Sequence, residues 1–325
     1  ARQGRTPAIL EKDFWVCWVL KRLFSLPGDN PALIFKGGTS LSKVYGAIRR
    51  FSEDIDLSFD RRDLGYVDER DPLKAPSQKK AEALIKDLEE DVIRHIDTLF
   101  LPRLREAIHA QLRPEDGQRW TLDKDPRDKQ GVLFTYPPSR SAGTYADLDY
   151  VRPVVRLELG ARSDHWPSER RRIRSYAAED FQDQFTTPDC EVTVLAAERT
   201  FWEKATILHA TYHQSDAKQL GERWSRHYYD LALLADTEYG KKALAQLNML
   251  ESVVKHKQTF FHAAWANYET ARPGSLRLAP RNDQLGALKA DYAKMAAMIF
   301  DEPPPRFDDL IARIELLEKQ VNGFR

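Results

Sequence analysis

Residues 33–59 constrain the fold more than any other stretch of the chain. The apolar run LIF at 33–35 predicts a strand, and the turn GGTS at 37–40 follows it. Apolar residues then recur at i, i+3, i+4 and i+7, which predicts an amphipathic helix at 41–50. The polar–apolar alternation at 54–59 predicts a second strand. This succession indicates an α/β unit built around a glycine turn.

The turn has the composition of a phosphate-binding loop. Glycines let a phosphate group approach the backbone closely, and a helix N-terminus offers free N–H groups and the positive end of a dipole. A hydroxyl can add one more donor. The candidate nucleotide-binding residues are therefore Gly37, Gly38, Thr39 and Ser40. A tight turn with a helix cap has the same composition, so these four residues alone leave both interpretations open.

Asp54 and Asp56 lie two positions apart in the second predicted strand, so both carboxylates project from one face. Adjacent carboxylates repel each other and raise each other's pKa unless a cation lies between them. Mg²⁺ commonly binds a few carboxylates together with substrate phosphates, and Mn²⁺ is a possible substitute. The alternative is an exposed strand face with chance acids. Following the phosphate turn, the pair predicts a Mg²⁺ site.

A third carboxylate is predicted in the strand at 153–160, PVVRLELG. Glu158 lies there on the polar face, so it is the candidate that completes a metal site with the aspartate pair. It is also placed to draw a proton from an attacking hydroxyl. The alternative is an ion pair between Glu158 and Arg156 or Arg162.

The rest of the chain divides into an α/β half and a helical half. Helices are predicted at 6–24 and at 78–111, the second broken near Pro102. The almost wholly polar stretch at 113–130 predicts a mobile loop. We therefore predict two domains, with boundaries as follows: 1–190, α/β, and 191–325, helical.

Composition excludes several classes of protein. The chain has 50 basic and 50 acidic residues, and a net charge of zero argues against a protein that coats nucleic acid indiscriminately. Cys17 and Cys190 are the only cysteines and form neither a metal cluster nor a disulfide framework, which indicates the cytoplasm. A signal-peptide pattern and long apolar runs are both missing, so no membrane partner is expected.

The pattern FKGGTSL followed by RFSEDIDL, with Glu11-Lys12-Asp13 near the N-terminus, resembles the AbiEii/AbiGii toxin family of nucleotidyltransferases. That family includes the MenT toxins and belongs to the DNA polymerase β-like superfamily. ERTFWEKATIL at 198–208 and RHYYDLALL at 226–234 resemble two of its helical motifs. The resemblance implies an α+β fold of the polymerase β type, a mixed sheet with flanking helices, plus a C-terminal helical domain.

The resemblance also implies roles for residues and partners. Lys204 would act at the nucleotide phosphates, while Arg226 and Asp230 would frame the nucleotide pocket. The implied reaction moves NMP from NTP·Mg²⁺ to an acceptor hydroxyl and releases pyrophosphate. The implied acceptor is RNA, with the tRNA 3′ end as the leading candidate. The implied partner is an antitoxin that neutralises the protein as a toxin.

Simpler interpretations remain open for the helical motifs. Lys204 borders an apolar stripe, where a solvated lysine is the alternative. Arg226 and Asp230 have i, i+4 spacing and could simply pair with each other. His209 and His213 have a spacing that zinc can use, but no third ligand is evident.

Three further alternatives concern the whole protein and its basic run. The run ERRRIR at 169–174 either contacts RNA phosphates or forms a solvated segment. The acceptor could instead be a small molecule or a protein. A non-catalytic nucleotide-binding module is a third possibility, against which the intact Asp-x-Asp pair argues.

Overall fold

The structure is a computed structural model that describes residues 6–28, 30–113, 119–138, 152–215 and 220–323. The chain folds into two compact units. Unit 1 comprises Ala1–Val44 and Phe51–Leu195, and unit 2 comprises Tyr45–Arg50 and Ala196–Arg325. The boundary predicted after residue 190 would cut a strand of unit 1. The six residues at 45–50, which sequence patterning placed in the first domain, belong to unit 2.

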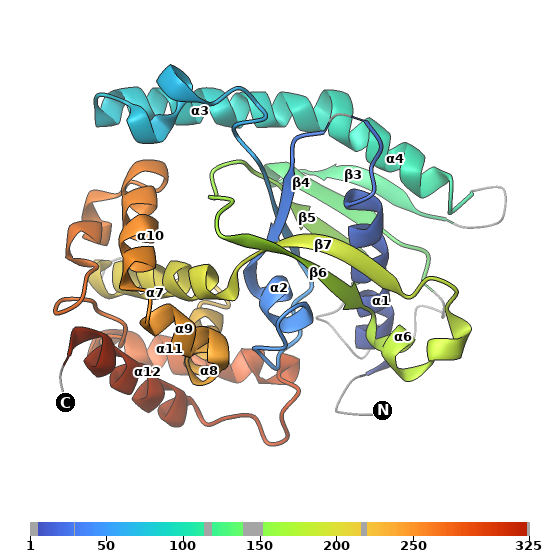
Figure 1. Ribbon diagram of the computed structural model, residues 1–325. Coiled ribbons are helices and arrows are strands. Elements are labelled where there is room, and N and C mark those ends of the chain that lie inside the picture. Colours follow the sequence, from blue (N-terminus) through green and yellow to red (C-terminus); the bar gives the residue numbers. More distant parts are fainter. Residues whose placement is uncertain (1–5, 29, 114–118, 139–151, 216–219, 324–325) are drawn as a thin grey trace. The chain divides into compact units, whose positions relative to one another are not determined.

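A seven-stranded mixed sheet forms the centre of the described part of unit 1 (Figure 1). Its strand order is β3-β4-β5-β2-β1-β7-β6. The pairs β1–β7 and β2–β5 are parallel, and the other neighbours are antiparallel. The strands are Leu33–Lys36 (β1), Ile55–Phe59 (β2), Thr121–Asp125 (β3), Asp128–Thr135 (β4), Val154–Glu158 (β5), Ser168–Arg174 (β6) and Asp189–Leu195 (β7).

One face of this sheet is apolar and is covered by helix α1 (Pro7–Leu23). The predicted N-cap is confirmed, since the Thr6 hydroxyl accepts from the Ile9 N–H. Trp15 and Trp18 pack their rings on Phe134 of β4 at centroid distances of 5.9 Å. Phe134 pairs with Val155 of β5, and partners in register project to the same face, so both side chains lie on the face that α1 covers.

Two further helices lie on the same apolar face. They are α3 (Gln78–His95) and α4 (Leu101–His109), joined by a π-helical turn at Ile96–Phe100. The ring of Phe59 in β2 contacts His95 at 5.1 Å and Phe100 at 5.3 Å, which ties the helix pair to the sheet. The break predicted near Pro102 is confirmed, since α4 begins with proline in its first turn. The short helix α6 (Tyr176–Asp180) lies between β6 and β7.

The helix predicted at 41–50 is wrong. Helix α2 spans Gly37–Lys43, so the glycine turn is itself its first turn. This helix ends at Lys43, with Val44 as its C-cap, and Gly46 beyond it adopts a left-handed backbone with φ +56°. Of the predicted apolar stripe, Leu41 is buried in unit 1, whereas the ring of Tyr45 contacts Tyr239 within unit 2 at 5.0 Å.

The mobile loop predicted at 113–130 is also wrong where the structure describes it. Residues 114–118 lie outside the described residues. The remainder includes β3 and the start of β4, which form an antiparallel hairpin. Leu122 is buried while its neighbours in β3 are exposed, so a single apolar residue is enough to anchor this polar strand to the sheet.

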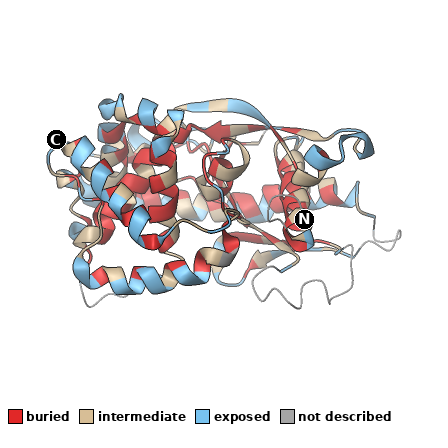
Figure 2. Ribbon diagram, turned by 90° about the horizontal axis from the view of Figure 1, so that it is seen from below, coloured by how far each residue is buried: buried red, intermediate tan, exposed pale blue. Residues whose placement is uncertain are grey.

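Unit 2 is helical in its described residues. Two of its helices, at 247–260 and 307–322, bury one side and expose the other, whereas the helix at 197–213 has no exposed residue (Figure 2). The helices are α7 (Ala197–His213), α8 (Ser225–Asp236), α9 (Glu238–Leu244), α10 (Leu247–Phe260), α11 (Asn282–Met295) and α12 (Phe307–Asn322). Among the described residues of the whole chain, no helix has the length and apolar character needed to cross a membrane.

Candidate active site

Three charged residues line up across neighbouring strands on the face of the sheet opposite α1. Lys36 of β1 lies opposite Asp56 of β2, and Asp56 lies beside Glu158 of β5. Partners in register project to the same face. We call these three residues the charged row. The sheet therefore brings together the second aspartate of the Asp-x-Asp pair and the predicted third carboxylate.

Glu158 of the charged row holds its proton more tightly than an isolated glutamate does. The pKa of Glu158 is raised to about 7, first by burial and then by the negative charge of Asp56. Asp54 adds a smaller effect, and a hydrogen bond between the Asp56 and Glu158 carboxyls also favours the protonated form. Burial likewise raises the pKa of Asp54, with the charges of Glu53 and Asp56 adding to it. This is the behaviour expected of clustered carboxylates without a cation.

Arg156 supplies the positive charge next to this cluster. Its guanidinium donates to Glu158, so the ion pair considered as an alternative is present. The same guanidinium donates to Asp125 at 2.9 Å. Arg162, the other partner considered for Glu158, pairs with Glu89 at 2.9 Å. Glu158 is thus both ion-paired and part of the carboxyl cluster.

The donor chemistry of this cluster fits a divalent cation, because Mg²⁺ prefers carboxylate oxygens. Asp56 and Glu158 would hold such an ion, with Asp54 next to them. Across the residues that the structure describes, no three Asp, Glu, His or Cys side chains are grouped as metal ligands. The three-ligand Mg²⁺ site therefore stays a prediction. What the structure does show is that strand pairing places Asp56 beside Glu158.

Gly37 leaves the space that the Asp56 side chain occupies. Its φ is +78°, a backbone conformation that favours glycine. A Cβ built on Gly37 would lie 1.9 Å from Oδ2 of Asp56 and 2.7 Å from its Cγ. The first glycine of the pair is therefore required for the position of a site carboxylate.

Gly37→Ala is expected to lower catalysis more than it lowers stability. The left-handed backbone costs an alanine about 1–2 kcal/mol, and the new methyl group displaces the Asp56 carboxylate. A misplaced catalytic group costs on the order of a hundredfold in rate. Gly286→Ala on α11 is the matched control, because nothing lies within 4 Å of its added Cβ. Measuring kcat and Tm of both variants tests this, and full activity in Gly37→Ala would contradict it.

The hydroxyls predicted to reach a phosphate already have backbone partners. Thr39 Oγ1 donates to the carbonyl of Asp54 at 2.5 Å, and Ser40 Oγ donates to the carbonyl of Gly37 at 2.9 Å. Both side chains are buried. Their contact with phosphate stays a prediction; their observed role is to hold Asp54 and the first turn of α2 in place. Gly38 is half-buried in that turn.

Residues near the N-terminus support the same segment. Lys12 of α1 forms an ion pair with Glu53, and Asp13 forms one with Lys43 at 2.7 Å. Both α1 residues are buried. They tie α1 to α2 and to the residue next to Asp54, so this part of the quoted motif has a supporting role in unit 1.

A second charged cluster lies inside unit 2, around Asp230. Arg50 donates to both carboxylate oxygens of Asp230, at 2.7 and 2.8 Å, and Lys204 lies 2.8 Å from Oδ2. All three side chains are buried. Burial would raise the pKa of Asp230, but the charges of Arg50 and Lys204 hold it well below its usual range. Burial lowers the pKa of Lys204.

This geometry corrects two sequence-based interpretations. Lys204 is not a solvated lysine at the border of a stripe, because it is buried and forms an ion pair with Asp230. Asp230 is not paired with Arg226, the partner that the i, i+4 spacing allowed. Its partner is Arg50, which the sequence analysis did not single out. The only feature of the sequence that points to Arg50 is its position directly before FSEDIDL.

Arg226 has no partner for its guanidinium among the residues that the structure describes. It is half-buried on α8 and its charge lowers the pKa of Lys204, which places it in the same neighbourhood. Unit 2 therefore gathers three cations around one carboxylate. Excess buried positive charge of this kind suits an anionic ligand such as a phosphate.

The histidine pair is explained by hydrogen bonds. His209 Nδ1 accepts from the Arg277 N–H at 3.0 Å, and Nε2 lies 3.0 Å from the carbonyl of Asn267. With both ring nitrogens engaged, His209 has no lone pair for zinc. Burial is the main cause that lowers its pKa to about 4, so the ring is neutral near pH 7. His213 lies 3.4 Å from the amide nitrogen of Asn267.

The basic run at 169–174 forms most of edge strand β6. Arg174 donates to Asp189 at 2.8 Å, and Arg172 lies 3.6 Å from Glu191, both across the pair with β7. These cross-strand ion pairs agree with a solvated edge. A contact of this strand with RNA phosphates stays a prediction.

Two comparisons with known proteins found matches. Residues 18–313 match a family model described as "Nucleotidyl transferase AbiEii toxin, Type IV TA system". Among solved structures, the chain is similar to MenT4, a nucleotidyltransferase toxin from Mycobacterium tuberculosis H37Rv, with a TM-score of 0.52 and 15% identity. The similarity covers 98% of this chain and 85% of that one and confirms the predicted fold class. No curated protein sequence matches the chain.

Proposed function

Because the chain belongs to the AbiEii family of nucleotidyltransferase toxins of type IV toxin–antitoxin systems, we propose that it transfers NMP to an RNA hydroxyl. Nucleotidyltransferases generally use an NTP and a divalent metal ion. We assign Mg²⁺, with Mn²⁺ as a substitute, to Asp54, Asp56 and Glu158. The leading acceptor is the 3′ end of tRNA, and the partner is a cognate antitoxin protein. The proposed setting is the cytoplasm, where NTPs and tRNA occur.

The observation that carries this proposal is the register pair of Asp56 and Glu158 beside Lys36. Two adjacent carboxyls and a neighbouring lysine form a site for a cation and for an anionic phosphate. The ammonium of Lys36 makes no ion pair or hydrogen bond with any residue that the structure describes, and it is half-buried. It is therefore available to contact a phosphate.

The proposed reaction forms one bond and breaks one. The acceptor oxygen bonds to the α-phosphorus while the bond from that phosphorus to the bridging oxygen breaks, so pyrophosphate leaves. The hydroxyl proton passes to the Glu158 carboxylate, which we assign as the general base because it lies beside Asp56. A bound metal ion supplies charge neutralisation at the phosphates.

Unit 2 is assigned the nucleotide phosphates through Lys204 and Arg226. Asp230 holds Lys204 in position, and Arg50 holds Asp230. We also assign nucleotide binding to Gly37, Gly38, Thr39 and Ser40 in the first turn of α2. The excess of cations over carboxylates around Asp230 supports the assignment of Lys204 and Arg226.

Incubation with each α-labelled NTP tests the function. The protein is mixed in turn with total RNA, with a protein extract and with a small-molecule extract, with and without Mg²⁺. We expect label on RNA of tRNA size, only with Mg²⁺, and none with Asp56→Asn. Label on protein or on a small molecule would replace the proposed acceptor. No label in any fraction with any NTP would contradict the proposed activity.

The pH dependence of stability gives a test that needs no activity. Between pH 4.5 and about 7 the folded chain retains a proton on Glu158 that the unfolded chain has lost. This contribution to stability is therefore full at low pH and is lost as the pH rises through 7. Glu158→Gln removes it, so the variant should exceed the wild type by about 1 kcal/mol at pH 8, after discounting for a side chain that is 38% exposed.

Urea unfolding of both proteins in EDTA, from pH 4.5 to 8, measures this difference. The difference between variant and wild type cancels the opposite pH dependence of the buried histidines. At pH 8, Mg²⁺ should raise the Tm of the wild type and have little effect on the variant. A difference that does not change with pH would show that Glu158 does not retain the proton.

A further inference from the structure

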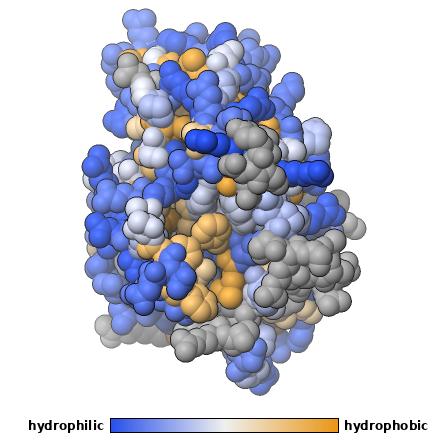
Figure 3. Space-filling view, turned by 90° about the vertical axis from the view of Figure 1, so that its right-hand side faces the viewer, coloured by the Kyte–Doolittle hydropathy of each residue, from blue (hydrophilic) through white to orange (hydrophobic). Residues whose placement is uncertain are grey.

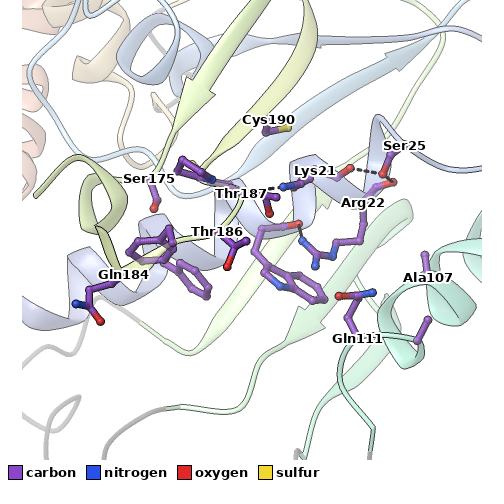
Figure 4. A pocket seen from close by; sticks show the side chains of 16 residues that line it. Lys21, Arg22, Ser25, Ala107, Gln111, Ser175, Gln184, Thr186, Thr187 and Cys190 are labelled. Atoms are coloured by element: carbon purple, nitrogen blue, oxygen red, sulfur yellow. Dashed lines mark hydrogen bonds between the residues drawn. The ribbon is translucent and has the colours of Figure 1, made fainter. Parts of the chain in front are cut away.

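A cavity of about 620 Å³ opens in unit 1 between α1, α4 and the segment that leads into β7 (Figure 4). Pockets for small molecules usually have volumes of about 300–1,000 Å³. On the side of unit 1 that carries these elements, Figure 3 shows hydrophobic side chains gathered around a hollow. The cavity is thus large enough for a ligand of small-molecule size.

This cavity is separate from the charged row. Its wall includes Trp18, which stacks on Phe134 and so lies on the apolar face of the sheet. It also includes Cys190 of β7. Cys190 and Val194 are four positions apart in this strand and so project to one face, and Val194 pairs there with the apolar Phe35 of β1. The side chains of the charged row project from the opposite face. A ligand here would leave the proposed catalytic residues free.

Two cations line the cavity without an acidic neighbour in its wall. Lys21 donates to the carbonyl of Thr187 at 2.9 Å, and Arg22 donates to the carbonyl of Trp18 at 3.0 Å. Neither forms an ion pair within the described residues, and none of the residues lining the cavity is Asp or Glu. The Arg22 guanidinium lies 3.5 Å from the Trp18 ring centroid. Since one of its N–H groups donates to the Trp18 carbonyl, most of its donors stay available to a ligand.

The other end of the cavity is aromatic. Phe14 and Phe185 contact each other with their ring centroids 6.1 Å apart. On α1, Phe14 and Lys21 are separated by about 10 Å along the helix axis. Gln184 lies at the aromatic end and Gln111 at the cationic end (Figure 4). Both amides are without a side-chain hydrogen bond in the described residues and can pair with polar edges of a ligand.

We propose that this cavity binds a nucleoside phosphate, with the phosphate at Lys21 and Arg22 and the heterocycle against Phe14 and Phe185. Cations in the last turn of a helix also stabilise its dipole, but that role requires neither a cavity nor an aromatic end. Burial lowers the pKa of Arg22 to about 10, a cost that a bound phosphate would offset. The ligand is either a free nucleotide or a nucleotide of an RNA strand.

Binding is measured on the full chain carrying Asp56→Asn, in EDTA, which removes the proposed metal site; the cavity variants then separate binding in the cavity from binding at the other proposed phosphate contacts. The probes are AMP, CMP, GMP, UMP, inorganic phosphate and a short single-stranded RNA, titrated by calorimetry. We expect saturable binding of at least one nucleotide or of the RNA. Arg22→Met should weaken it at least tenfold, and Lys21→Arg should retain it. Tighter binding of the RNA would assign the RNA strand, and tighter binding of a mononucleotide would assign the free nucleotide.

A second variant tests the cavity without touching the cations. Ala107→Leu on α4 fills the cavity from the opposite wall and should abolish binding. His109→Leu on the same helix lies outside the lining and should leave binding unchanged. Three results would overturn the proposal: no saturable binding, binding unaffected by Ala107→Leu, or inorganic phosphate binding as tightly as every nucleotide and the RNA.

Discussion

Asp56→Asn is expected to lower the rate of NMP transfer by at least about a thousandfold while the fold is kept. Charge stabilisation by a bound metal ion contributes several kcal/mol to a transition state, and each 1.36 kcal/mol is a factor of ten. Asn has the shape of Asp but lacks the charge, so the space beside Gly37 stays filled. Removing the negative charge also removes a cause of the raised pKa of Glu158.

The matched control is Asp123→Asn on edge strand β3, an exposed residue outside the charged row. It should keep both activity and Tm. Initial rates with labelled NTP, together with thermal unfolding, measure the two variants. Asp56→Asn that retains more than a tenth of the wild-type rate would remove Asp56 from the catalytic site.

Asp230→Ala is expected to destabilise the protein by about 3–5 kcal/mol, because it leaves two buried cations without their carboxylate. Arg50 and Lys204 both depend on Asp230 and are themselves buried. The loss should appear in the unfolding of unit 2. Urea denaturation monitored by circular dichroism measures it, with a Tm several degrees lower as the second readout.

Asp236→Ala on the same helix is the control, because Asp236 is 65% exposed where it pairs with Arg313. Exposed ion pairs contribute about 0–1 kcal/mol. Replacing all three buried charges at once, by Asp230→Leu with Arg50→Met and Lys204→Met, should restore much of the stability, since buried charges are costly to desolvate. If Asp230→Ala loses less than 1 kcal/mol, Asp230 does not neutralise these cations.

Local periodicity was enough to find the elements that carry the site. The strands β1, β2 and β5 and the helix α1 were predicted close to their observed bounds, because alternation and amphipathic spacing are visible within a few residues. It failed at residues 41–50, where an apolar stripe spans two units rather than one helix. It also failed at β3, where one buried leucine in a polar segment carries too weak a signal.

The sequence by itself determined the family, the strand that carries Asp56 and the strand that carries Glu158. Only the tertiary structure decided that Glu158 lies beside Asp56, that Gly37 must lack a side chain and that Asp230 takes Arg50 as its partner. Strand order and register join segments about a hundred residues apart, and periodicity within one segment contains no record of its neighbours. Side-chain burial depends on the same distant contacts, which is why the sequence left a solvated Lys204 open as an alternative and the fold buries this residue.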